Sequence, residues 1–263
     1  MSYWKGKVIV VTGGSAGLGL CLASTAIERG ANVALIARNS ERLSAACQRL
    51  GHRAVAFSAD ITSQQEVDRC HVDILNRFGR VDALLNCAGK STRGQILNTT
   101  PEEFQQLYEL NFLALVRCTR AFMPELIDAK GHLVNIGSLA SKSVSRFLGA
   151  YPASKFPVAA YSHQLRLELE ETGVHILLAC PGPIARTDAG ERYSDTNVPA
   201  AAQKPGGGVK LKGIDPELLA EKIFLACERR QPELVVPAKA RLLFVLSQIS
   251  PRLGDWMIRK MSG

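Results

Sequence analysis

The alternation of short apolar runs with longer segments of helical spacing constrains this fold more than any other feature. The first run, Val8-Ile9-Val10-Val11, has no polar interruption, which is typical of a strand buried on both faces. Strands are predicted at Lys7–Thr12, Asn32–Ala37, Ala54–Ser58, Ala83–Asn86, His132–Gly137, His175–Ala179 and Leu234–Pro237. Helices are predicted at Gly17–Arg29, Ser40–Leu50, Ser63–Phe78, Glu102–Asp128, Tyr151–Glu171 and Pro216–Glu228. This order predicts a doubly wound α/β fold, a seven-stranded parallel sheet with helices on both faces.

The length of 263 residues suits one such domain, which we expect to span residues 1–237. Residues 186–213 lack periodicity and contain Gly206-Gly207-Gly208, so they are predicted to form a substrate loop or lid over the carboxyl edge of the sheet. The 7 cysteines are scattered and form no CxxC pair. They predict reduced thiols in the cytoplasm, with no disulfide framework and no metal site.

Charge and hydropathy exclude two classes of partner. The net charge is +8, but the sequence has no lysine- or arginine-rich block and no DNA-binding motif, so nucleic acid is not an expected partner. No apolar run approaches the roughly 18 residues of a membrane span. Strand one starts at Lys7, which leaves no room for a secretory signal.

A glycine-rich loop, Thr12-Gly13-Gly14-Ser15-Ala16-Gly17-Leu18-Gly19, joins the first predicted strand to the first predicted helix. Glycines let the backbone approach a pyrophosphate closely, and the helix N-terminus offers free N–H groups to the anion. The loop therefore predicts a Rossmann-type dinucleotide site formed by Gly13, Ser15, Gly17, Leu18 and Gly19. A glycine-rich turn without a ligand is the alternative, which the position between strand and helix makes less favourable.

The end of the second strand bears on the choice of cofactor. An acid there binds the ribose 2′-hydroxyl of NAD, whereas an arginine accommodates the 2′-phosphate of NADP. Here the strand ends in Ala37-Arg38-Asn39, with no acid before Glu41. The guanidinium of an arginine can form bidentate hydrogen bonds to a phosphate. We therefore predict NADP(H), with Ser15 and Asn39 as further contacts. A solvent-exposed Arg38 and NAD(H) as cofactor form the alternative.

Three polar residues predict proton transfer at the carboxyl edge of the sheet. Tyr151 and Lys155 are four residues apart on one predicted helix and share a face. A neighbouring ammonium favours the phenolate, which makes a tyrosine a better acid–base catalyst near neutral pH. Ser138 follows the fifth strand, where its hydroxyl can hold a substrate oxygen. An exposed helix pair and a turn serine are the structural alternatives.

Taken together, these motifs resemble the short-chain dehydrogenase/reductase family from about Lys7 to Pro237. The glycine loop is similar to the family's TGxxxGxG, and Tyr151 to Lys155 is similar to its YxxxK, with Ser138 thirteen residues earlier. Further matches are Asp60, Asn86-Cys87-Ala88-Gly89, which is similar to NNAG, Asn111 at the position of the asparagine of the family's catalytic tetrad, and Pro181-Gly182 after strand six.

The resemblance implies a role for each matched residue. Tyr151 would be the general acid in reduction and the base in oxidation, Lys155 would assist it and bind the nicotinamide ribose, and Ser138 would orient the carbonyl. Asn111 would hold a water that links Lys155 to solvent, with a helix kink or cap as its alternative. The cofactor would also contact Asp60, Ile61, Asn86, Ala88, Gly89, Pro181, Gly182 and Ile184. A homo-oligomer is implied as well.

Three positions depart from the family pattern. Cys87 replaces the second asparagine of NNAG, with little expected chemical effect. Pro157 follows Lys155 within the predicted helix and is expected to bend it. Arg186 falls where the family often has a threonine beside the nicotinamide carboxamide, and Thr187 comes one residue late.

The last residues, 238–263, form an amphipathic basic extension. Lys239, Arg241, Arg252, Arg259 and Lys260 outnumber the single acid, Asp255, which leaves a net charge of +4 on this segment. Apolar residues flanked by basic ones suit a helix at a membrane surface. They also suit a helix pair that closes over the active site or packs on a second subunit, which is the preferred interpretation.

The sequence thus predicts an NADP(H)-dependent enzyme that moves a hydride between a carbonyl and an alcohol, on a small-molecule or lipid-like substrate. A basic rim on the loops Lys90–Gln95 and Leu139–Ala150 and on the long loop from Arg186 suggests an anionic substrate, although a solvated loop surface is the favoured explanation. A catalytically silent NADP(H) sensor or scaffold of the same fold is the main alternative, and an NAD-dependent alcohol dehydrogenase is the third.

Overall fold

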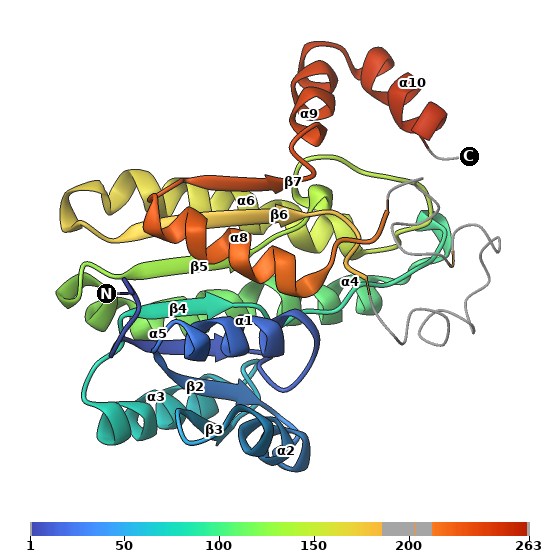
Figure 1. The fold of residues 1–263 in the computed structure, drawn as a ribbon. Helices are drawn as coiled ribbons and strands as arrows, with labels where there is room; N and C mark the ends of the chain where they lie inside the picture. Colours follow the sequence, from blue (N-terminus) through green and yellow to red (C-terminus); the bar gives the residue numbers. More distant parts are fainter. Residues whose placement is uncertain (1, 186–202, 204–211, 262–263) are drawn as a thin grey trace.

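A computed structural model describes residues 2–185, 203 and 212–261 of the chain. Its seven strands form one parallel sheet in the order β3-β2-β1-β4-β5-β6-β7. The strands are β1 (Val8–Thr12), β2 (Asn32–Ala37), β3 (Ala54–Ser58), β4 (Ala83–Asn86), β5 (His132–Ile136), β6 (His175–Pro181) and β7 (Glu233–Val236). The predicted doubly wound sheet is therefore confirmed (Figure 1), and the predicted strand ends differ by no more than two residues.

Helices cover both faces of the sheet (Figure 1). They are α1 (Gly17–Glu28), α2 (Ser40–Leu50), α3 (Gln64–Phe78), α4 (Pro101–Tyr108), α5 (Ala114–Asp128), α6 (Tyr151–Glu168), α8 (Pro216–Glu228), α9 (Ala240–Ile249) and α10 (Pro251–Met261). The short helical turns are η1 (Ile96–Asn98), η2 (Glu109–Leu113), η3 (Leu139–Ser141) and η4 (Glu170–Thr172). The α1, α2 and α8 helices pack on one face of the sheet, and α3, α5 and α6 pack on the other.

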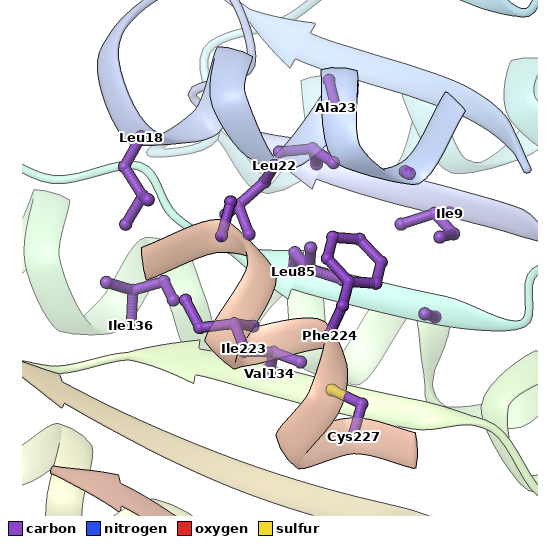
Figure 2. Close-up of a cluster of buried hydrophobic side chains, with 14 of the residues drawn as sticks. Ile9, Leu18, Leu22, Ala23, Leu85, Val134, Ile136, Ile223, Phe224 and Cys227 are labelled. Carbon is purple, nitrogen blue, oxygen red and sulfur yellow. The ribbon is translucent and has the colours of Figure 1, made fainter. Parts of the chain in front are cut away.

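The core beneath α1 and α8 fixes the sheet edge that carries the glycine loop. Figure 2 shows Leu22 of α1 and Phe224 of α8 packed side by side above Leu85 of β4. All three side chains are almost fully buried. Burial of a large apolar side chain contributes about 1.5–3 kcal/mol relative to exposure, so this cluster holds the start of α1 firmly against the sheet.

The long helix predicted over Glu102–Asp128 is instead three pieces. Thr100 caps α4 with Glu103 in a capping box, and α4 passes through the π-helical turn η2 into α5. A π turn contains an i→i+5 hydrogen bond, which apolar spacing does not reveal. The predicted Tyr151–Glu171 helix is also shorter, since it ends at Glu168 and continues into the 3₁₀ turn η4.

Two histidines lie buried together at the opposite, amino edge of the sheet. His132 begins β5 and His175 begins β6, and their Nδ1 atoms are 2.9 Å apart. The Tyr3 hydroxyl lies 2.7 Å from His132 Nε2, and His175 Nε2 lies 2.8 Å from the Gln231 carbonyl oxygen. A carbonyl only accepts, so His175 donates through Nε2 and accepts at Nδ1 from His132, which in turn accepts from Tyr3. Neutral rings satisfy every one of these contacts.

Acid should destabilise the fold through this pair. Burial, together with nearby positive charges, lowers the pKa of His132 to about 3. Burial also lowers the pKa of His175, whereas a histidine of the unfolded chain titrates near its usual 6.5. Stability is therefore complete above about pH 6.5 and falls as the pH drops toward about 3, because the unfolded state then binds more protons. We expect urea unfolding to show a loss on the order of 3 kcal/mol between pH 7 and pH 4.5.

The control for this experiment is His163, which is exposed on α6. The pH dependence should become shallower in a His132→Gln/His175→Gln variant and stay unchanged in His163→Gln. An equal slope in all three proteins would show that the acid sensitivity comes from other groups.

Candidate active site

A cleft of about 1510 Å³ opens at the carboxyl edge of the sheet. The strand order reverses there, since β1 lies beside both β2 and β4, and such switch points are where doubly wound folds bind ligands. Residues predicted from the sequence supply much of its lining, namely Gly13, Gly17, Leu18, Gly19, Ala88, Gly89, Ser138, Tyr151, Lys155, Pro181, Gly182 and Ile184.

The glycine loop presents the N-terminus of α1 to this cleft. Gly13 has a φ of +70°, and a Cβ there would lie 2.9 Å from the Ala88 Cα, so only glycine allows this close approach of β1 and β4. The Thr12 hydroxyl reinforces the approach by accepting from the backbone N–H groups of Cys87 and Ala88 at 3.0 and 3.1 Å. The α1 helix has neither a side-chain cap nor an acid in its first turn. Its free N–H groups therefore suit a pyrophosphate.

The ends of β2 and β3 lie beside the cleft lining rather than within it. Arg38 is 70% exposed, and its Nη1 lies 3.8 Å from Asp60 Oδ2. Burial would raise the pKa of Asp60, but hydrogen bonds from the Thr62 N–H and hydroxyl, aided by Arg38, hold this pKa below its usual value. The Asn39 side chain accepts from the Arg42 N–H at 2.7 Å and caps α2. None of Ser15, Arg38, Asn39, Asp60 and Ile61 is among the residues that line the cleft.

Tyr151 and Lys155 lie on the first turns of α6, and both line the cleft. The buried Lys155 Nζ donates to the Ile136 carbonyl at 2.9 Å. Burial lowers the pKa of Lys155 to about 8, because a desolvated ammonium is disfavoured. Lys155 is thus mostly charged near neutral pH and loses its proton as the pH rises only slightly above neutral.

Ser138 is fixed by the turn that follows β5. Its hydroxyl oxygen accepts from the Ala140 N–H at 3.1 Å, and its own N–H donates to the Ser141 hydroxyl at 3.0 Å. These two bonds orient the side chain at the start of η3. Because the oxygen is used as an acceptor, the hydroxyl keeps its hydrogen for donation to a ligand in the cleft.

Asn111 lies in the π turn η2 and is almost fully buried. Its Oδ1 accepts from the Lys90 N–H, and its Nδ2 donates to the Lys90 carbonyl and the Ser154 hydroxyl, all at 2.8 Å. Ser154 donates in turn to the Tyr151 carbonyl at 2.7 Å. A Cβ at Gly89 would lie 2.9 Å from Asn111 Oδ1 and 3.5 Å from Lys155 Nζ. Gly89 thus lies between Asn111 and Lys155, and the role of Asn111 in a proton relay stays a prediction.

Asn86 lies at the end of β4, beneath the cleft. Its side chain is buried in the core and does not line the cleft. Its Nδ2 donates to Thr119 Oγ1 and Asn135 Oδ1, each at 3.0 Å, and Asn135 donates to the Ser162 hydroxyl at 2.9 Å. The side chain of Asn86 therefore joins β4 to β5 and α5 beneath the site.

Several supporting residues were not predicted from the sequence, notably Thr12, Ser154 and Ser141. Each is a small buried polar residue whose partner is backbone or a distant side chain. The sequence signal that could have identified them is a polar residue within an apolar strand or helix, because a buried polar group requires a hydrogen-bond partner. The identity of those partners depends on the tertiary fold.

The departures from the family pattern have limited structural consequences. Cys87 lines the cleft, and burial raises its pKa to about 12, so it stays a protonated thiol. The α6 helix continues through Pro157 to Glu168.

Of the predicted basic rim, Lys90 and Arg93 line the cleft, whereas Lys142 is paired with Glu233. Arg186, Thr187 and most of the 186–213 loop lie outside the described residues.

The C-terminal extension forms the helix pair α9–α10, and one side of this pair contributes to the cleft wall. Its contributing side chains include Leu243, Phe244, Met257 and Ile258. Across residues 2–185, 203 and 212–261, no helix combines the length and apolar character of a membrane span.

The sheet, the glycine loop and the cleft define a doubly wound dinucleotide-binding domain. Residues 7–197 match the family model described as short chain dehydrogenase. The chain therefore belongs to the short-chain dehydrogenase family, whose members are oxidoreductases that bind a nicotinamide cofactor.

Relatives and solved structures agree with this assignment. The chain is 30% identical over 264 residues to the uncharacterized oxidoreductase YxnA of Bacillus subtilis, covering 98% of this chain and 72% of that protein. It is 29% identical over 270 residues to the ketoacyl reductase HetN of a Nostoc species, covering 98% and 90%. A short-chain dehydrogenase from Streptomyces avermitilis superimposes with a TM-score of 0.82 at 30% identity, covering 96% of this chain and 97% of that one. L-Sorbose reductase from Gluconobacter frateurii, complexed with NADPH and L-sorbose, superimposes with a TM-score of 0.76 at 25% identity, covering 88% and 95%.

Proposed function

We propose that this protein is an NADP(H)-dependent oxidoreductase that interconverts a carbonyl and an alcohol, with Tyr151 as its general acid and base. The observation that carries the proposal is the convergence of Ser138, Tyr151 and Lys155 on one cleft beside the glycine loop. The relatives add support, because one is named a ketoacyl reductase and another was solved with NADPH and a sugar.

The cofactor would extend along the carboxyl edge of the sheet. The α1 N-terminus and the loop residues Gly13, Ser15, Gly17, Leu18 and Gly19 would hold its pyrophosphate. Contacts to the rest of the cofactor would come from Arg38, Asn39, Asp60, Ile61, Ala88, Gly89, Tyr151, Lys155, Pro181, Gly182 and Ile184. When bound, the nicotinamide supplies or accepts the hydride, and the protein contributes position and electrostatics.

The side chains of the cleft would divide the proton chemistry among them. The Ser138 hydroxyl donates a hydrogen bond that holds the substrate oxygen, and the Tyr151 hydroxyl delivers a proton to that oxygen during reduction. The Lys155 ammonium stabilises the negative charge that then remains on the phenol oxygen. Through Ser154, Asn111 holds the first turn of α6, and the second lone pair of its Oδ1 can accept from a water in the proton relay.

The preference for NADP(H) rests on Arg38. Because a hydrogen bond between charged groups is worth about 1.5–3 kcal/mol, and because an aspartate would also repel a phosphate, Arg38→Asp should weaken NADPH binding by about a hundredfold. NADH has no 2′-phosphate, so its affinity should change by less than about threefold. Fluorescence titration with both cofactors measures the two dissociation constants.

Arg42→Asp is the matched control, since Arg42 is also an exposed arginine and lies on the next helix, α2. It should change neither affinity appreciably. Equal losses for NADPH and NADH in Arg38→Asp would assign the specificity elsewhere and would favour NAD(H) as cofactor.

The direct test of the proposed function is NADPH consumption against a panel of carbonyls, from small ketones and sugars to long-chain keto lipids. Turnover of any member supports the proposal and its substrate class. Tight NADPH binding without turnover across the panel would favour the catalytically silent sensor or scaffold. The complete Ser138, Tyr151 and Lys155 set argues against that alternative, because a sensor does not require all three.

A further inference from the structure

The α9–α10 helix pair stands beyond the β7 edge of the sheet, away from the main body (Figure 1). Phe244 is the buried anchor of α9, and α10 packs chiefly against α9. A Cβ at Gly254 would lie only 2.5 Å from the Ser247 hydroxyl oxygen, so the two helices cross at very close range. They therefore behave as one structural unit.

This unit has two apolar sides. The side that lines the cleft carries Phe244, Met257 and Ile258. Outside the cleft lining, two large side chains are strongly exposed: Ile249 on α9 is 74% exposed, and Trp256 on α10 is 53% exposed. Val245, four residues before Ile249 and on the same face of α9, extends this outer stripe. A cluster of exposed large apolar residues on a helix pair is typical of an interaction surface.

Charge indicates what covers the outer stripe. The segment from residue 238 onward carries a net charge of +4, and Arg252, Arg259 and Lys260 of α10 are exposed. The Lys260 ammonium lies 5.1 Å from the centre of the Trp256 ring. Two copies meeting through this stripe would bring like charges together, which opposes self-association. An anionic lipid surface instead accepts both the apolar residues and the cations, and tryptophan is favoured at that interface.

We propose that the outer stripe of α9–α10 docks on an anionic lipid surface. The opposite side of the same helices lines the cleft, and a helix with its side chains is about 10–12 Å thick, so docking brings the cleft close to the acyl boundary. A carbonyl compound with an apolar chain can then pass from the lipid to Tyr151 along an apolar wall. This last step rests on the proposed function, whereas docking itself does not.

The experiment is vesicle flotation of the full chain. Vesicles of phosphatidylcholine alone are compared with vesicles that also contain phosphatidylglycerol, at low and high salt. We expect binding to the anionic vesicles, and a clear reduction at high salt because screening weakens the attraction. Removing each basic residue near the surface should lower the partition coefficient by about fivefold, which Arg252→Gln/Arg259→Gln tests.

The decisive variant is Ile249→Gln/Trp256→Gln, since neither residue lines the cleft. It should lower vesicle binding by at least about tenfold. Val72→Gln/Leu167→Gln is the matched control, because these apolar residues of α3 and α6 are 53% and 62% exposed. The control should bind vesicles as the native chain does. Both variants should reduce a small water-soluble ketone at the native rate.

Two results would overturn the proposal. The first is flotation that is absent, or equal for native chain and double variant. The second is a halved molar mass of Ile249→Gln/Trp256→Gln in light scattering without any vesicle binding, which would assign the stripe to a second copy. Failure of the proposed oxidoreductase activity is distinguishable, because flotation requires neither cofactor nor turnover.

Discussion

Replacing Tyr151 with phenylalanine should lower kcat by about a thousandfold or more while NADPH binding stays within about threefold of native. The change removes one oxygen from a side chain that lines the cleft, and it leaves the ring in place. A positioned general acid typically contributes 10²–10⁴-fold to a rate, so its loss falls on the chemical step. Steady-state kinetics with the carbonyl found in the panel, together with cofactor titration, measure both quantities.

Tyr161 offers the same substitution outside the cleft. It lies on α6 and packs edge-to-face on Phe112 at 5.9 Å between ring centroids. Tyr161→Phe should keep native kcat. If Tyr151→Phe retained turnover, Tyr151 would have no part in proton transfer, and the proposed mechanism would be wrong even if the enzyme reduced its carbonyl.

Replacing Lys155 with methionine should have two opposite effects: activity falls by about a hundredfold or more, and stability rises at neutral pH. The rise follows from burial, which lowers the pKa of Lys155 from 10.5 to about 8. That difference corresponds to about 3 kcal/mol of destabilisation while the ammonium is charged. Loss of the hydrogen bond to the Ile136 carbonyl offsets about 1 kcal/mol. The net gain at pH 7 is therefore about 2 kcal/mol.

The pH dependence separates this effect from ordinary repacking. Between pH 8 and 10.5 the unfolded chain holds a proton at Lys155 that the folded chain has released. Native stability therefore increases with pH over this interval, and the advantage of Lys155→Met shrinks. Urea unfolding at pH 7 and pH 10 measures it, with the exposed Lys222→Met of α8 as control. A variant that is less stable than native at pH 7 would show that Lys155 stabilises the fold.

The parts of this molecule that depend on local patterns were predictable from the sequence. The uninterrupted run from Val8 gave β1, and the glycines after Thr12 indicated the turn into α1, because both signals lie within a few neighbouring residues. The positions of Ser138, Tyr151 and Lys155 followed from where strands and helices end. The order of the parallel strands then brought these residues to one cleft.

What could not be predicted depends on contacts between distant segments. Nothing in the spacing around Asn111 distinguishes a π turn from a regular helix, and its bond to Ser154 joins two helices far apart in sequence. Likewise, the resemblance to NNAG implied a cofactor contact for Asn86, but the amide nitrogen of its side chain donates to Thr119 and Asn135 in the core. Local rules identify a polar group that requires a partner, whereas only the fold identifies that partner.

The crossing of α9 and α10 at Gly254 has a consequence for how such a protein can diversify. The helix pair lies outside the sheet and beyond β7 (Figure 1), so its side chains can change without altering the register of any strand or the glycine loop. The wall that α9 and α10 contribute to the cleft is thereby structurally separate from the part that the sheet edge and α6 contribute. Substitutions in the C-terminal helices alone can therefore reshape one wall of the cleft, while the glycine loop and the ends of the strands stay in place.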